Sequence, residues 1–327
     1  MRIDVHAHYT PTEYLDFLAE HGSPDSGRGA RVAPGAGLSI EGRLGLLDEV
    51  GIDLQVLSVG SSTPYLTDET RAVGAARLAN DRYADLSSQY PARFAAFGTV
   101  PLPHVDAALA EVGRCLDELG MLGITVGCSV AGRQLDDPAL APFFTELDRR
   151  GTVLFLHPQG VGCGPGTGDF GMAWLVGAPV EDTAAALRLI MSGMLDRYPR
   201  VKIVVPHLGG VLPFLAQRID DLTGHSVARQ RAEDQAPAIQ GPPGAYYRRL
   251  WYDTVNSHPA ALRCACETFG ADRLLLGTDY PYLVGAQWAP LVRYVEQAGF
   301  SPEDTAAILG GNAQLLLGLE RAEPAQS

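Results

Sequence analysis

Short runs rich in valine, isoleucine and leucine recur along this chain of 327 residues, and glycine or proline bounds most of them. Eight such runs lie near residues 2–6, 52–58, 94–99, 122–126, 152–157, 201–206, 250–254 and 273–278. The runs are continuously apolar and do not alternate strictly, which is typical of strands that are covered on both faces. The chain is therefore expected to build a largely buried, parallel sheet.

The segments between these runs have the periodicity of helices. Many carry apolar residues three and four positions apart, and they span 67–89, 105–119, 138–150, 181–196, 211–222, 259–269 and 286–298. Eight parallel strands that alternate with helices close into a barrel. We therefore predict an α/β fold, a (β/α)8 TIM-type barrel with loop insertions. No repeat or linker divides the chain, so we expect residues 1–327 to form a single domain.

Three segments depart from this pattern. Residues 22–42, 159–179 and 224–245 are rich in glycine, proline or polar residues. Loops of this length in a compact domain are usually functional or mobile. The first two follow strands that end in histidine, so they could cover a site at those strand ends.

Charge and composition exclude several classes of partner. A net charge of −13 and a pI near 5.0 argue against nucleic acid or an anionic membrane as a partner. No basic, apolar leader is visible at the start, and no apolar run approaches the roughly 18 residues of a membrane span. The odd number of cysteines lacks a disulfide-like framework, so we interpret all five as reduced: Cys115, Cys128, Cys163, Cys264 and Cys266. A cytoplasmic enzyme fits these features best.

Five side chains suited to metal binding stand at the ends of the predicted strands. His6 and His8 are two residues apart, so a strand would point both rings to one face. His157, His207 and Asp279 end the fifth, sixth and eighth runs. Imidazole nitrogens and a carboxylate are ligands that Zn²⁺ and similar ions prefer.

The barrel prediction explains why these five positions belong together. Active sites of such barrels gather at the carboxyl ends of the strands, so we expect the five groups to meet there. Any single histidine has the alternative of a hydrogen-bonded structural residue, which we expect for His21, His104, His225 and His258. The joint placement of the five favours a metal site.

Four motifs surround these residues in order: DVHAH at 4–8, FLHP at 155–158, PHLGG at 206–210 and LGTDYP at 276–281. They resemble the amidohydrolase superfamily, in its branch of aminocarboxymuconate-semialdehyde decarboxylase and related non-oxidative decarboxylases. The resemblance runs from residue 1 to about residue 317. It implies that His6, His8, His157 and Asp279 bind one divalent ion, and that His207 is an acid/base near the metal-bound water.

The resemblance extends to residues that would bind the substrate. Arg43 and Arg218 resemble positions that hold substrate carboxylates in the decarboxylase, the second across the interface of a homodimer. A planar guanidinium suits a carboxylate because it donates two parallel hydrogen bonds. The alternative for each is an arginine on a helix surface. Trp174 resembles an aromatic position of that site, whereas Gln159 stands where the decarboxylase has tryptophan.

The number of bound ions follows from the lysine content. Binuclear members of the superfamily bridge two ions with a carboxylated lysine at a strand end. The 25 basic residues of this chain include one lysine, Lys202, and therefore 24 arginines. Lys202 lies five residues before His207, roughly 17 Å away along a strand. We predict a single divalent ion, Zn²⁺ first and Mn²⁺ as its main rival.

The leading functional hypothesis is a metal-dependent decarboxylase of a small unsaturated or aromatic carboxylic acid. His207 and Asp279 would handle the proton of a water that the ion activates. The same site could hydrolyse a lactone or amide, or hydrate an unsaturated dicarboxylate, because each reaction needs an activated water. A metal-binding scaffold without catalysis is a fourth possibility, but it would not require an acid/base such as His207.

Overall fold

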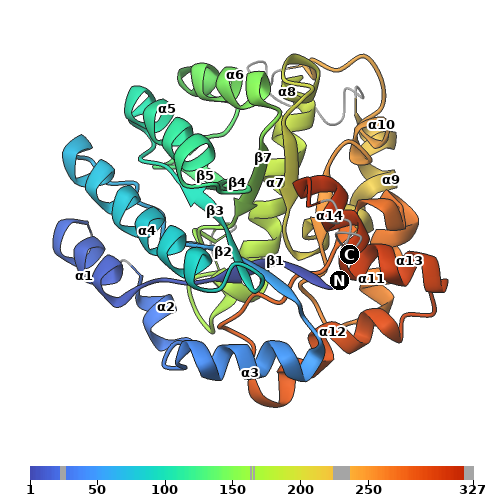
Figure 1. The fold of residues 1–327 in the computed structure, drawn as a ribbon. Helices are drawn as coiled ribbons and strands as arrows, with labels where there is room; N and C mark the ends of the chain where they lie inside the picture. Colours follow the sequence, from blue (N-terminus) through green and yellow to red (C-terminus); the bar gives the residue numbers. More distant parts are fainter. Residues whose placement is uncertain (23–26, 163, 165, 224–235, 320–327) are drawn as a thin grey trace, which may run out of the picture.

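Eight parallel strands form the barrel of the computed structural model, which describes residues 1–22, 27–162, 164, 166–223 and 236–319 (Figure 1). In the order of their pairing they are β1 (Ile3–His8), β2 (Leu54–Ser58), β3 (Phe94–Thr99), β4 (Gly123–Gly127), β7 (Val153–His157), β8 (Lys202–Val205), β9 (Trp251–Asp253) and β10 (Leu274–Leu275). The barrel closes between β1 and β10, where the Val5 amide donates to Leu276 O at 2.9 Å. The predicted (β/α)8 barrel is confirmed.

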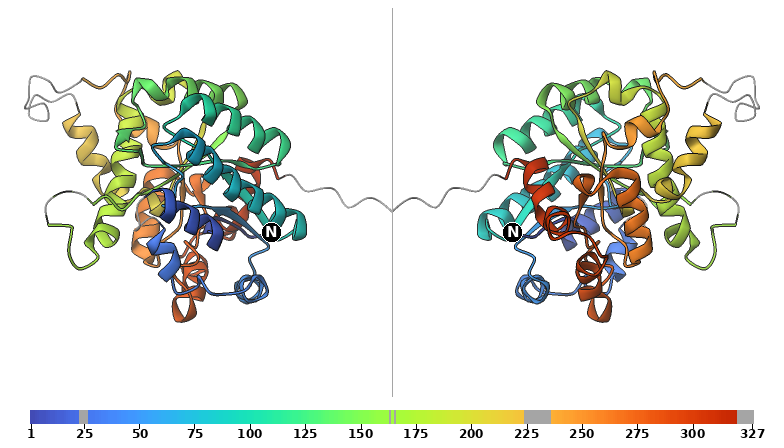
Figure 2. Two further views of the ribbon diagram at one scale, coloured as in Figure 1. Left: turned by 90° about the vertical axis from the view of Figure 1, so that its left-hand side faces the viewer. Right: turned by 90° about the vertical axis from the view of Figure 1, so that its right-hand side faces the viewer.

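Helices surround the strands in a ring (Figures 1 and 2). The α-helices are α1 (Thr12–His21), α2 (Arg28–Val32), α3 (Ile40–Val50), α4 (Glu69–Gln89), α5 (Val105–Gly113), α6 (Ala141–Arg150), α7 (Ala178–Met191), α8 (Met194–Arg197), α9 (Leu212–Leu222), α10 (Gly244–Tyr247), α11 (Pro259–Phe269), α12 (Trp288–Glu296), α13 (Pro302–Ala306) and α14 (Asn312–Leu317). Short 3₁₀ or π turns are η1 (Arg114–Glu118), η2 (Pro138–Leu140), η3 (Ala173–Gly177), η4 (His207–Gly209), η5 (Ala271–Arg273), η6 (Gly285–Gln287) and η7 (Ala307–Gly311). A small hairpin, β5 (Ser129–Val130) with β6 (Arg133–Gln134), follows β4.

The core has two layers that fix where the strand ends point. One cluster of apolar side chains fills the barrel interior and includes Val5, Phe97, Phe155 and Val204. A second, larger cluster packs the outer faces of the strands against the helices. Side chains two residues apart on a strand point to the same face. Phe155 points into the barrel, so His157 points inward as well, at the carboxyl end of the strand.

The expected long loops are only partly irregular. Residues 22–42 include α2 and the first turn of α3, whose start is capped by Ser39 Oγ accepting from the Gly42 amide at 3.1 Å. Residues 159–179 end in η3 and the start of α7. In the third segment, 224–235 lie outside the described residues, and α10 occupies part of the remainder. Glycine and proline content hid these short helices.

The described cysteines are reduced, as predicted. Cys115, Cys128, Cys264 and Cys266 are free thiols, and Cys163 lies outside the described residues. Within the described part of the chain, no helix is both long and apolar enough to cross a bilayer.

Candidate metal centre

Four side chains from three strand ends converge at the carboxyl end of the barrel. His6 and His8 come from β1, His157 ends β7, and Asp279 follows β10. One potential ligand atom from each lies within 4.8 Å of the others. Nε2 of His6 and Nε2 of His8 are 3.1 Å apart, and Asp279 Oδ1 lies 2.9 Å from the latter. The structure thus brings together four of the five residues that the sequence singled out, and these are the four that the resemblance implies as ligands.

The hydrogen bonds of His6 and His157 leave the same ring nitrogen of each free to bind an ion. His6 Nδ1 lies 2.7 Å from Asp253 Oδ2, and His157 Nδ1 lies 2.8 Å from Pro158 O. A carbonyl or an ionised carboxylate can only accept, so Nδ1 carries the hydrogen in both rings. Their Nε2 lone pairs therefore point into the cluster.

His8 is oriented in the same way by a serine. Its Nδ1 lies 2.9 Å from Ser58 Oγ, and that hydroxyl in turn donates to Ala7 O at 3.4 Å. Ser58 can therefore accept from His8 Nδ1 while its own hydrogen is directed to Ala7 O, which leaves His8 Nε2 able to bind an ion. Three imidazole lone pairs consequently face one another across a small space.

Such a cluster fits a divalent cation. His157 Nε2 is buried and makes no hydrogen bond to the described residues. Ligand bonds of about 2.0–2.2 Å would place four donors around one ion at spacings like those seen. The described residues contain one such group. Lys202 is not part of it, since its Nζ donates to Leu316 O at 3.2 Å, so the site is mononuclear.

The electrostatics of the cluster favour a positive charge within it. Burial alone would raise the pKa of Asp279. The charge of His6 and hydrogen bonds from three histidines outweigh this effect and hold the pKa well below its usual range. Burial lowers the pKa of His6, yet Asp253 and Asp279 raise it more, to about 9. The carboxylates that favour a proton on His6 equally favour a metal cation. Burial keeps the pKa of His157 well below its usual value, in the neutral form that binds metals.

His207 lies beside the cluster without being one of its four members. Its Nε2 is 3.8 Å from Asp279 Oδ2, and its Nδ1 is 2.9 Å from Asp182 Oδ2. Burial lowers the pKa of His207, but the carboxylates of Asp182 and Asp279 more than offset this and hold it well above its usual value. This position suits a group that donates a proton towards the site.

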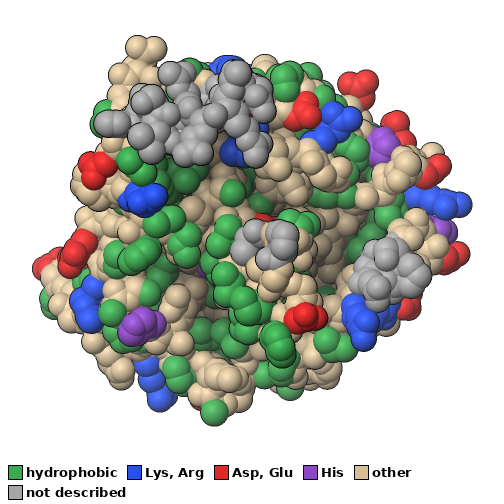
Figure 3. Space-filling view, turned by 180° about the vertical axis from the view of Figure 1, so that it is seen from behind, with side chains coloured by type: hydrophobic (Ala, Val, Ile, Leu, Met, Phe, Trp, Pro, Cys, Tyr) green, Lys and Arg blue, Asp and Glu red, His purple; other side chains and the backbone are tan. Residues whose placement is uncertain are grey.

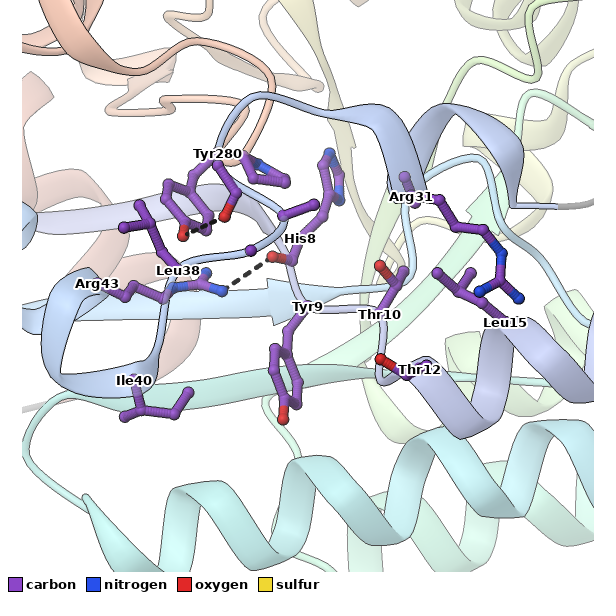
Figure 4. Close-up of a pocket in the computed structure, with 15 residues that line it drawn as sticks. His8, Tyr9, Thr10, Thr12, Leu15, Arg31, Leu38, Ile40, Arg43 and Tyr280 are labelled. Carbon is purple, nitrogen blue, oxygen red and sulfur yellow. Dashed lines mark hydrogen bonds between the residues drawn. The ribbon is translucent and has the colours of Figure 1, made fainter.

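Arg43 of α3 lies beside His8, one of the four clustered residues (Figure 4). The side chain is 3% exposed, so its alternative as a surface-helix arginine is wrong. Its Nε donates to Gln55 Oε1 at 2.7 Å and its Nη1 to His8 O at 3.0 Å, while Nη2 has no hydrogen-bond partner among the described residues. The guanidinium carbon lies 4.2 Å from the centre of the Tyr280 ring.

The structure places the other two predicted substrate residues at the surface. Trp174 is 49% exposed in η3, where its ring packs against Gly160, and a Cβ at Gly160 would lie 2.5 Å from that ring. Arg218 is exposed on α9. Neither has a hydrogen bond or ring contact with the cluster within the described residues, so their predicted roles remain predictions.

The family comparison agrees with this arrangement. The sequence model of the amidohydrolase family, described as Amidohydrolase, matches residues 3–319. The chain belongs to the amidohydrolase family. Among curated relatives, this amidohydrolase is 32% identical to 2-amino-3-carboxymuconate-6-semialdehyde decarboxylase of Dictyostelium discoideum, over 85% of this chain and 76% of that protein. It is 33% identical to gamma-resorcylate decarboxylase of a Polaromonas species, over 85% and 87% of the two chains.

Solved structures of family members have the same fold. Dihydroxybenzoic acid decarboxylase from Polaromonas, with bound manganese and the inhibitor 2-nitroresorcinol, aligns with a TM-score of 0.80 at 29% identity, over 100% of this chain and 99% of that one. 5-Carboxyvanillate decarboxylase from Sphingomonas paucimobilis aligns with a TM-score of 0.84 at 27% identity, over 97% and 98%. The predicted class, a metal-dependent decarboxylase of the amidohydrolase superfamily, is thereby confirmed.

Sequence reasoning missed the residues that orient this amidohydrolase's ligands. Asp253 ends β9 and could have been found, because it occupies the same strand-end position as the predicted ligands. Ser58 ends β2 and gave a weaker signal, since serine is common at strand ends. Asp182 lies within α7 and no local pattern marks it.

Proposed function

We propose that this protein removes carbon dioxide from a small aromatic carboxylic acid, with His6, His8, His157 and Asp279 holding one divalent ion. The observation that carries the proposal is the convergence of three bare imidazole nitrogens and a carboxylate beside His207. An ion bound there would lower the pKa of a water molecule and would polarise an oxygen of the substrate. The curated relatives that act on aromatic acids support the choice of substrate class.

In this proposal His207 is the proton donor. Nε2 of His207 gives a proton to the ring carbon that bears the carboxylate, and that carbon forms a new C–H bond. The carbon–carboxylate bond then breaks, its electron pair returns to the ring, and carbon dioxide leaves. A proton from water restores His207, so the reaction consumes one proton for each carboxylate released. Asp279 faces Nε2 and stabilises the charged ring before transfer.

We assign Arg43 to the substrate carboxylate or to a second anionic group of the substrate. Its guanidinium is buried, and among the described residues it forms no ion pair with a carboxylate. Burial lowers the pKa of Arg43 to about 10. It borders a cavity of about 280 Å³ that His8, Arg31 and residues 35–38 also line (Figure 4). A buried cation with a free N–H is costly unless an anion pairs with it.

The identity of the ion is a separate part of the proposal. Three imidazoles and one carboxylate favour Zn²⁺, while manganese in the structures of two relatives makes Mn²⁺ the alternative. Elemental analysis of active protein should find one ion per chain. Reconstitution of metal-free protein with Zn²⁺ and with Mn²⁺ would then show which ion restores turnover.

We further propose that the active form is a homodimer in which Arg218 of one chain completes the site of the other, with Trp174 near the substrate. The exposed apolar side chains of residues 161–176 support such an interface. The cytoplasmic location suggested by composition stays a prediction.

Carbon dioxide release tests the reaction directly. Incubation with 2,6-dihydroxybenzoate, 5-carboxyvanillate and 6-methylsalicylate, each followed by ultraviolet absorbance and by trapped carbon dioxide, should give equimolar loss of acid and gain of gas for at least one. Loss of a lactone, an amide or an unsaturated dicarboxylate without carbon dioxide would instead support the hydrolase or hydratase alternative.

A further inference from the structure

A second carboxylate lies behind His207, on the opposite side of its ring from Asp279. Asp182 of α7 is fully buried, and its Oδ2 lies 2.9 Å from His207 Nδ1. Nε2 of the same ring faces Asp279 Oδ2 at 3.8 Å. The ring therefore has one carboxylate at each nitrogen, and only Nε2 faces the metal cluster.

A cysteine holds the other oxygen of Asp182. Cys128 follows β4, is 4% exposed, and donates from Sγ to Asp182 Oδ1 at 3.4 Å. Burial raises the pKa of this thiol well above its usual value, so the sulfur keeps its hydrogen and acts as a donor. With both oxygens engaged, the carboxylate has a fixed orientation.

The same helix also fixes the backbone of His207. Thr183, next to Asp182, accepts from the Val211 amide at 2.8 Å, and its single hydroxyl hydrogen lies within reach of Pro179 O at 2.9 Å and Gly209 O at 3.2 Å. From the other side, the His207 amide donates to Asp253 Oδ1 at 2.9 Å. The loop can therefore turn little, and the two ring nitrogens of His207 keep their places between Asp182 and Asp279.

We propose that Asp182 is a positioning residue that keeps a hydrogen on Nδ1 of His207, so that Nε2 serves the reacting carbon, and that Cys128 fixes the carboxylate in this orientation. An ionised carboxylate accepts only, so Nδ1 must donate to it. The hydrogen bond to Asp182 stabilises the charged ring that gives up its proton from Nε2, and after the transfer it keeps the remaining hydrogen on Nδ1, so that Nε2 can take up the next proton. The catalytic part rests on the proposed function, whereas the tautomer is a property of the protein itself.

Asp182→Asn gives a sharp test because an amide places its oxygen towards one neighbour, Cys128 or His207, and its NH₂ towards the other. The thiol hydrogen of Cys128 favours the amide oxygen in the place of Oδ1, and the amide NH₂ then faces His207 Nδ1. That NH₂ forces Nδ1 to accept, so the ring is held neutral with its one hydrogen on Nε2 and cannot form the charged imidazolium that supplies the proton. We expect kcat to fall by roughly 10²–10⁴-fold, as for loss of an acid/base, with KM and metal content near those of the wild type.

The double variant Asp182→Asn/Cys128→Ala supplies the rescue. Without the thiol the amide can flip, its oxygen can face His207, and at least a tenfold part of the lost kcat should return. Asp136→Asn is the matched control, because Asp136 takes two hydrogen bonds of 2.8 Å from Arg188 of α7 and its described hydrogen bonds do not involve His207, Asp182 or Cys128. It should leave kcat unchanged, which separates loosening of α7 from loss of the tautomer.

A second readout does not depend on the reaction. Long-range proton–nitrogen NMR spectra of zinc-loaded protein with ¹⁵N-histidine, with His207 assigned from His207→Gln, should show hydrogen on Nδ1 in the wild type and a bare Nδ1 in Asp182→Asn. A bare Nδ1 in the wild type, or wild-type kcat in Asp182→Asn, would overturn the proposal. The expected spectra in a protein that decarboxylates no acid would uphold the positioning role and refute the proposed function instead.

Discussion

Asp253 links the predicted ligands to the predicted acid/base. Its Oδ2 accepts from His6 Nδ1 at 2.7 Å, while its Oδ1 accepts from the amides of His207 and Val255, each at 2.9 Å. One rigid side chain thus sets both the direction of a ligand lone pair and the path of the loop that carries His207. The distance between ion and proton donor is therefore built into the barrel.

Two histidine variants separate metal binding from chemistry. His157→Ala removes a buried ligand, so metal and activity should be lost together. His207→Ala should keep near-normal metal content but lose turnover by roughly 10²–10⁴-fold, the usual scale for an acid or base. Elemental analysis and kcat of both proteins provide the measurements. If both variants lose the ion to the same extent, His207 is itself a ligand and the division of roles is wrong.

Arg43→Lys tests the carboxylate site while keeping a positive charge. Lysine cannot reproduce the fork of the guanidinium, and a hydrogen bond to a charged group is worth about 1.5–3 kcal/mol. We expect KM to rise about tenfold to a hundredfold, with metal content unchanged. Arg31→Lys is the control, because Arg31 lines the same cavity but is paired with Asp16 at 2.7 Å. Equal KM values for the two variants would make Arg43 a structural residue.

At this scale the sequence predicted which side chains converge better than how their rings are oriented. His6, His8, His157 and Asp279 were found because a strand end is visible in the hydropathy pattern. The partner of each Nδ1 depends on which strand lies next to which, as with Ser58 and His8 or Asp253 and His6. Such contacts bridge 50 and 247 residues of chain, so no local pattern records them.

The turn after β8 is the most constrained element of the site. His207, Leu208, Gly209 and Gly210 all have positive φ, between 55° and 73°. Residues with a side chain seldom adopt this conformation, and a run of them persists only where surrounding contacts fix it. Here Asp182, Thr183 and Asp253 make those contacts.

Gly210→Ala should break this turn. Gly210 has φ 65° and ψ −120°, and a Cβ there would lie 1.9 Å from Pro179 O. We expect a loss of at least about 3 kcal/mol in the free energy of unfolding, since backbone atoms would have to move. Gly299→Ala is the matched control, with φ +84° and no atom within 4 Å of its Cβ, and should lose only about 1–2 kcal/mol. Urea denaturation compares the two, and equal losses would mean that the turn is not packed tightly.

All eight strands were predicted, but several helices were not. The strands are buried on both faces, so their apolar runs stand out from the flanking sequence. By contrast, α2 lies in a segment rich in glycine and proline, and α10, α13 and α14 have only four to six residues each. Helices of one to three turns depend on packing against the barrel more than on their own periodicity.

The molecule as a whole carries an unusual exposed apolar segment. Val161, Phe170, Trp174 and Leu175 are between 49% and 92% exposed, and hydrophobic side chains gather on the face seen in Figure 3. Contiguous exposed apolar surface commonly marks a protein interface. The segment follows β7, the strand that carries His157, so an interface there would lie close to the site.

Assembly is therefore expected to control activity. Leu175→Arg would bury a charge in an apolar interface and should give a monomer with its ion bound but little turnover. Leu315→Arg is the control, since Leu315 is 75% exposed on α14, and this variant should remain a fully active dimer.

Arg218→Ala should keep both the dimer and the ion while losing activity, because its guanidinium would be missing from the neighbour's site. Sedimentation velocity, metal analysis and kcat on each protein make the comparison, and a wild-type protein that sediments as a fully active monomer rules out a shared site.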